Sequence, residues 1–155
     1  MLKRLMTIAA AAAVFGFANT AQAEELFGAQ LSGGAEVPSV DTRARGVVRL
    51  SVNDTETQLH YELRVSNIED ITQAHIHRGA AGENGPVVVF LFGFIGEGVT
   101  RNGLLAANTR TSADLIGPLA GEPLSALIDQ IRSGNTYVNV HTVDNPPGEI
   151  RGQLF

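Results

Sequence analysis

The residues of this chain that could take part in chemistry are histidines. Three of them lie at or near the end of a stretch in which apolar and polar residues alternate. His75 and His77 lie two apart at the end of the run 71–77, and a glycine-rich turn follows at residues 79–86. His141 closes a second alternating run, residues 135–141, and another turn follows it. Imidazole nitrogens bind copper, zinc, nickel and iron. The spacing therefore raises the hypothesis that these three histidines share one transition-metal ion.

Alternation of this kind is typical of β-strands, in which residues i and i+2 point to the same face. We therefore expect each histidine to point away from the aliphatic side chains of its own strand. His60, the fourth histidine of the chain, follows the same rule in the run 58–65. The parity predicts that all four histidines lie on polar faces and outside the apolar core.

A site of three histidines leaves one coordination position for water or a further ligand. The candidates for that position are His60 and the carboxylate of Glu149. Because histidine must be neutral to bind a metal, we expect the affinity to fall as the pH drops below about 6.5. The alternative is that the imidazoles cap backbone carbonyls in the two turns and bind no ion. Convergence of the ring nitrogens to within roughly 4 Å would favour the metal, because the metal–nitrogen bonds are about 2.0–2.1 Å long.

Two further charged residues share a face near the end of the chain. Glu149 and Arg151 lie two apart in the run 149–154. We expect them to form a solvated ion pair, which adds little stability by itself.

The first 23 residues have the pattern of a cleaved signal peptide. Lys3 and Arg4 precede an apolar run at residues 6–17, and the sequence AQA at 21–23 fits a signal-peptidase site. The apolar run is too short and too rich in alanine for a good membrane span. We therefore expect a periplasmic or secreted protein in which residues 24–155 form a single domain, with no membrane span after cleavage.

The composition excludes several classes of protein. The chain has no cysteine, so disulfides, thiolate metal sites and cysteine nucleophiles are all excluded. The formal charge is −5 and basic residues do not cluster, which argues against nucleic acid or an anionic lipid surface as a partner. No nucleophile elbow is present, so we expect no enzymatic activity and no catalytic residues.

Six alternating runs and one continuous apolar run, at 87–94, predict about seven strands. They lie at residues 26–32, 45–52, 58–65, 71–77, 87–94, 135–141 and 149–154. The second and third of these runs flank a short turn and should form a hairpin. Residues 103–107 fit either a short strand or an irregular crossing. Region 109–134 is the only helical one. Ser112 lies in a predicted N-cap, prolines at 118 and 123 divide the segment, and helical spacing follows from Leu124, with Gly134 just past the end. We expect an all-β, antiparallel Greek-key β-sandwich, immunoglobulin-like in outline, with one short crossover helix.

Two blocks of the sequence resemble the CHRD domain, which is named for chordin and is also found alone in many exported bacterial proteins. The first block is AHIHxG with GxxGPV at residues 74–87, and the second is YVNVHT at 137–142 with PGEIRGQL at 147–154. The opening segment is similar as well, with LSG at 31–33, EVP at 36–38 and Thr42. The resemblance covers residues 27–154 and departs from the common pattern in the double proline at 146–147. It implies a β-sandwich domain outside the cytoplasm, which in chordin accompanies modules that bind secreted signalling proteins, and it supplies no catalytic residues.

A weaker resemblance links the chain to copper/zinc superoxide dismutases, which place a His-x-His pair on a strand of a Greek-key sandwich. The matching positions are His75, His77 and His141, but the disulfide cysteines and a separate zinc-binding loop are missing. Three hypotheses follow, in order of preference. The first is a non-enzymatic protein that binds copper or zinc, the second a metal-free module that binds an extracellular protein or glycan, and the third a copper-dependent redox enzyme.

Overall fold

The computed structural model describes residues 24–155, which form one sheet of eight strands and one α-helix. The strands are β1 (Glu25–Ser32), β2 (Arg45–Val52), β3 (Leu59–Ser66), β4 (Ile71–Arg78), β5 (Val87–Gly93), β6 (Gly103–Arg110), β7 (Thr136–Thr142) and β8 (Ile150–Gln153). The helix α1 spans Leu124–Arg132, and three 3-10 turns span Gly33–Ala35, Ser112–Asp114 and Gly117–Leu119. The predicted signal peptide lies outside the described residues. Within residues 24–155, α1 is too short to cross a bilayer and no other helix meets that requirement.

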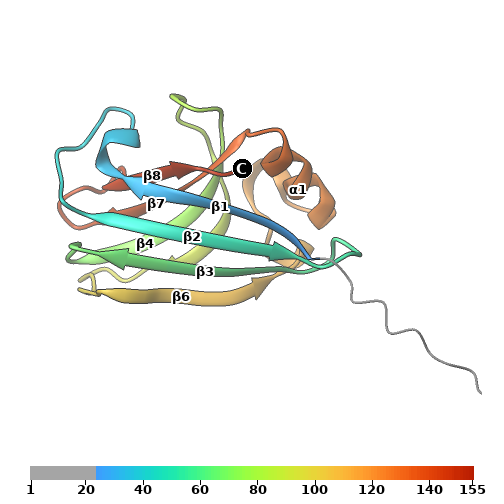
Figure 1. The fold of residues 1–155 in the computed structure, drawn as a ribbon, viewed down its shortest axis with the longest axis horizontal. Helices are drawn as coiled ribbons and strands as arrows, with labels where there is room; N and C mark the ends of the chain where they lie inside the picture. The colour runs from blue at the N-terminus through green and yellow to red at the C-terminus, as the bar shows by residue number, and fades with distance from the viewer. Residues whose placement is uncertain (1–23) are drawn as a thin grey trace, which may run out of the picture.

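The sheet curls so that its two end strands approach each other. Its order is β5-β4-β7-β8-β1-β2-β3-β6, and every pairing is antiparallel. The result is a nearly closed barrel with α1 at one end and the loop between β1 and β2 at the other (Figure 1). The predicted all-β antiparallel class and the β2–β3 hairpin are confirmed. A sandwich would have two sheets, whereas here β1 pairs with β2 on one side and with β8 on the other, which joins all eight strands.

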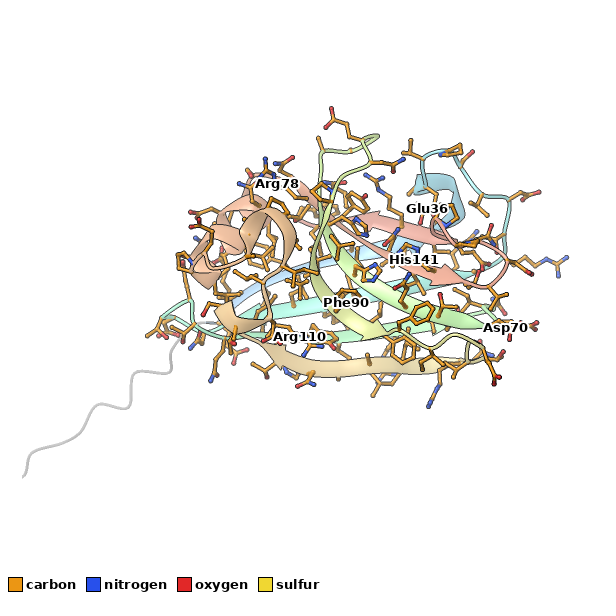
Figure 2. The ribbon with its side chains drawn as sticks, turned by 180° about the vertical axis from the view of Figure 1, so that it is seen from behind. Glu36, Asp70, Arg78, Phe90, Arg110 and His141 are labelled. Atoms are coloured by element: carbon orange, nitrogen blue, oxygen red, sulfur yellow. The ribbon has the colours of Figure 1, made fainter. Side chains whose placement is uncertain are left out.

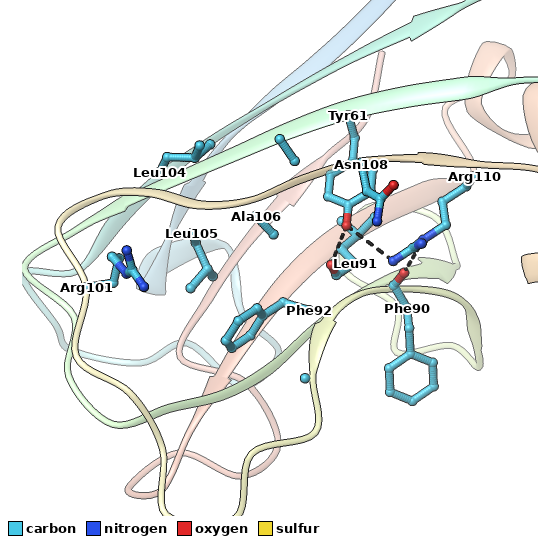
Figure 3. Close-up of a pocket in the computed structure, with 12 residues that line it drawn as sticks. Tyr61, Phe90, Leu91, Phe92, Arg101, Leu104, Leu105, Ala106, Asn108 and Arg110 are labelled. Atoms are coloured by element: carbon cyan, nitrogen blue, oxygen red, sulfur yellow. Dashed lines mark hydrogen bonds between the residues drawn. The ribbon is translucent and has the colours of Figure 1, made fainter.

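Side chains close the seam between β5 and β6. The Tyr61 hydroxyl donates a hydrogen bond to the Leu91 carbonyl, and Arg110 donates to the Phe90 carbonyl and to the Tyr61 hydroxyl (Figure 3). A cavity of about 500 Å³ lies along this seam. β6 contains residues 103–107, for which the sequence did not distinguish a short strand from an irregular crossing. Its burial does not alternate cleanly, which explains the ambiguity.

The barrel interior holds the aliphatic faces that the alternation predicts. The side of β2 that faces inward carries Gly46, Val48, Leu50 and Val52, and that of β3 carries Leu59, Tyr61, Leu63 and Val65. α1 buries Leu124, Leu127, Ile128 and Ile131 against the same core. Strand pairing and this packing must stabilise the fold alone, since no disulfide is available.

The helical region is divided at its prolines and its α-helix is short, as predicted. Ser112 begins a 3-10 turn capped by Thr111, and the α-helix starts only at Leu124, after Pro123. Prolines at positions 118 and 123 prevent a continuous helix, because proline lacks the backbone N–H that a helix interior requires. Gly134 follows the helix end with a φ of 68°, as predicted for that position.

Candidate metal centre

Two neighbouring strands bring the three predicted ligands together. His75 and His77 lie on β4, and His141 lies on β7, which pairs directly with β4. Ala74 and Ile76 point into the core and are fully buried, so the histidines occupy the opposite, outer face of the sheet. The parity prediction is therefore correct for this pair of strands.

The outer face of β4 and β7 is nevertheless covered. His75, His77 and His141 are only 3, 8 and 6 % exposed, whereas His60 on β3 is exposed. None of them belongs to the apolar core, as predicted, but the expectation of polar faces did not foresee this burial. Three loops, residues 33–44, 79–86 and 143–149, supply the cover. Figure 2 shows His141 on this face of the sheet, between Glu36 of the first loop and Phe90 of β5.

Backbone carbonyls in two of these loops fix the tautomers of two imidazoles. His77 Nδ1 lies 2.8 Å from the Gly85 carbonyl, and His141 Nδ1 lies 2.8 Å from the Pro146 carbonyl. A carbonyl only accepts hydrogen bonds, so each Nδ1 must carry the hydrogen and donate it. Both Nε2 atoms therefore keep a free lone pair, which is the form of imidazole that binds a metal.

Ring nitrogens of the three histidines converge on one small region. His141 Nε2 lies 3.0 Å from His75 Nδ1, which must then donate the hydrogen of this bond in the metal-free state. One ring nitrogen from each of the three histidines lies within 4.8 Å of the others. Two nitrogens bound to one ion cannot lie more than about 4.1 Å apart, because each bond is about 2.0–2.1 Å long. The separation exceeds the roughly 4 Å expected of a formed site, so one ring must move by at least about 0.7 Å to complete one.

Two nitrogens of this group have no partner. The Nε2 atoms of His75 and His77 are buried and make no hydrogen bond. The amide oxygen of Asn139, which pairs with His75 across the β4–β7 ladder, is also buried without a partner. Buried polar atoms are almost always satisfied in native proteins, so a water molecule or an ion is expected among these side chains.

The environment keeps all three histidines neutral. Burial lowers the pKa of His75 to about 3, with smaller contributions from the nearby His141 and His77. Burial also lowers the pKa of His77 and that of His141, although their hydrogen bonds to backbone carbonyls oppose the shift. Neutral imidazole is the metal-binding form, so no proton has to leave at neutral pH.

Aromatic rings hold two of the imidazoles in place. His77 stacks on Tyr137 with ring centroids 4.8 Å apart and planes 9° apart. Phe90 meets His75 edge to face at 4.5 Å. Both contacts restrict rotation of these two imidazoles.

Arg151 is the residue that the sequence interpretation placed wrongly. It is 2 % exposed, and its guanidinium lies 3.3 Å from the centre of the Tyr137 ring, so it is no part of a solvated pair. The guanidinium donates to Asn84 Oδ1 and to the carbonyls of Ala80 and Glu83, which folds the loop 79–86 over the site. The alternation of residues 149–154 places Arg151 on the outer face of the sheet. This was the sign in the sequence that its side chain could lie beside the histidines.

Neither predicted fourth ligand joins the three histidines. His60 lies on β3, where its Nδ1 is 3.5 Å from the Thr109 hydroxyl. The two carboxylate oxygens of Glu149 accept hydrogen bonds from Thr42 and Thr142. Glu149 therefore anchors the loop 33–44 to the end of β7.

Comparison with known families identifies the domain. The model of the CHRD domain matches residues 27–154. The chain belongs to the CHRD family. CHRD domains occur in extracellular proteins and act as protein-interaction modules. Comparisons of this CHRD chain with curated proteins and with solved structures gave no match.

Proposed function

We propose that this CHRD protein is a non-enzymatic, exported protein that binds one transition-metal ion, copper or zinc, through His75, His77 and His141. The observation that carries the proposal is that three buried imidazoles each bring a ring nitrogen within 4.8 Å of the others, while the Nε2 atoms of His75 and His77 make no hydrogen bond. A buried polar atom left unpaired costs about 1–3 kcal/mol, and an ion that uses these lone pairs removes that cost. Neutral, carbonyl-anchored imidazoles are the second support for the proposal.

The buried position of the trio argues for storage or transport of the ion rather than for catalysis. A catalytic metal keeps one coordination position open to substrate or water. Here the loops and Phe90 cover the three rings, and their exposed fractions are 8 % or less. The extracellular setting of the family and the signal pattern at residues 1–23 support a role outside the cytoplasm.

Isothermal titration of the metal-free protein with copper and with zinc tests this function. We expect one ion per chain, and we expect His75→Ala or His141→Ala to weaken binding by more than about 100-fold, since loss of a group that only orients a ligand already costs 10–100-fold. His60→Ala is the matched control, because His60 is exposed and lies on another strand. The proposal fails if the unsubstituted protein binds neither ion, or if His60→Ala weakens binding as much as His75→Ala does.

A further inference from the structure

We propose that the ion held by the three histidines is cuprous copper, Cu(I), rather than a divalent ion, an inference that rests on the proposed metal-binding function. Within residues 24–155 the group of ligands consists of three histidines and includes no carboxylate. The chain has no cysteine, so a thiolate is excluded as well. Neutral ligands leave the full charge of the ion uncompensated.

Burial makes this charge decisive. The three imidazoles are 3–8 % exposed, so an ion between them would lose nearly all of its contact with water. The solvation cost of moving an ion into a medium of low dielectric constant grows with the square of its charge, which makes it about four times larger for a divalent ion. A monovalent ion is therefore strongly favoured at this place.

A buried cation beside the site adds to this preference. The Arg151 guanidinium lies over the Tyr137 ring, which stacks in turn on His77, so its charge is no more than about 8 Å from the centre of the His77 ring. Its hydrogen bonds go to neutral oxygens of Asn84, Ala80 and Glu83. At an effective dielectric constant of about 20 and a separation of about 8 Å, the charge of Arg151 weakens the binding of an ion roughly thirty-fold for each positive charge that the ion carries.

The number of ligands points the same way. Zn²⁺ in proteins is almost always four-coordinate, and Cu²⁺ prefers tetragonal sites. The carboxylate of Glu149 is held by two threonines, and the Glu36 carboxyl packs against Gly148 and Asn139 rather than among the ring nitrogens. Cu(I), a monovalent ion with a filled d shell, accepts three nitrogen ligands without a fourth.

An anaerobic competition experiment on the metal-free protein tests the choice of ion. Cu(I) is titrated against bicinchoninate, a chromophoric cuprous chelator, and Zn(II) is titrated against a chromophoric zinc chelator. We expect one Cu(I) per chain, bound at least about 100-fold more tightly than Zn(II). Zinc binding as tight as Cu(I) binding overturns the inference but leaves the metal-binding function standing. Binding of neither ion overturns both.

Substitution of Arg151 separates charge from packing. Arg151→Met removes the positive charge, so the ratio of Cu(I) to Zn(II) affinity should fall by at least about ten-fold. Arg151→Lys keeps the charge and should retain most of the ratio, even if the lost hydrogen bonds lower both affinities. A purely structural role for Arg151 would lower both affinities equally in both variants, and that result contradicts the electrostatic part of the argument.

Discussion

The two nitrogens of an imidazole allow the same histidine to anchor a loop and still offer a lone pair to an ion. The Nδ1 atoms of His77 and His141 cap loop carbonyls, as a metal-free anchor would, while their Nε2 atoms keep free lone pairs. Alternation along each strand predicted that His75, His77 and His141 point away from the aliphatic side chains, because residues two apart share a face. The role of Arg151 could not be predicted, because its partners in the loop 79–86 lie about seventy residues away in sequence.

Burial changes the expected pH dependence of metal binding. Protons compete with the ion for the same lone pairs, and the folded protein lowers the pKa of all three histidines below 6.5, that of His75 to about 3. Affinity should therefore stay nearly constant as the pH falls through 6.5, and decline only at lower values. Titrations between about pH 7.5 and 5.5 check this, since an unperturbed histidine would lose affinity within that window. A marked loss of affinity already at pH 6.5 would contradict the lowered pKa values of the three histidines.

At the scale of elements, strands are predictable from the sequence and loops are not. β4 and β7 begin and end within one residue of the predicted runs, because alternation continues through them. The cover over the histidines depends instead on contacts between loops. Asn84 donates to the Val37 carbonyl, for example, and thereby joins the loop 79–86 to the loop 33–44. Such long-range contacts leave no local pattern in the sequence.

Glu36 gives the loop 33–44 a measurable pH dependence. Its side chain is buried, and this raises its pKa from 4.5 to about 7, although the charge of Arg151 opposes the shift. The native state therefore holds this proton more tightly than the unfolded chain does. The resulting stabilisation is complete below pH 4.5 and is lost as the pH rises through 7.

Substitution of Glu36 by glutamine should remove this loss. Relative to the unsubstituted protein, Glu36→Gln should gain up to about 3 kcal/mol of unfolding free energy between about pH 5 and pH 8. Urea denaturation at the two pH values measures the difference. Glu69→Gln, at an exposed position, is the matched control and should show no such trend. Parallel pH profiles for Glu36→Gln and the unsubstituted protein would refute the assignment.

At the scale of the whole molecule, the all-β class followed from composition and periodicity, but the single curled sheet did not. The sheet becomes continuous because β1, near the start of the described chain, pairs with β8 at its end. Closure then depends on Arg110 of β6 and Tyr61 of the adjacent β3, which donate hydrogen bonds to carbonyls of β5 at the other end of the sheet. Neither feature has a signature in local sequence, because both join distant segments.

Tyr61 should therefore stabilise the closed barrel. Tyr61→Phe removes the hydrogen bond to the Leu91 carbonyl and should lower the free energy of unfolding by about 1–2 kcal/mol. The amide protons of β5 should also exchange faster with solvent, whereas those of β1 and β2, away from the seam, should not. Uniform acceleration across the sheet would show that the bond contributes to global stability but does not hold the seam.

The most direct test of the central claim is nuclear magnetic resonance of the four imidazoles, through long-range correlations between ring nitrogens and carbons. In the metal-free protein, His77 and His141 should show the tautomer with hydrogen on Nδ1, as their carbonyl partners require. One equivalent of Cu(I), added without oxygen, should shift one ring nitrogen each of His75, His77 and His141 and leave His60 unchanged. Unchanged resonances for the three buried histidines, or a shift confined to His60, would contradict the proposed metal centre.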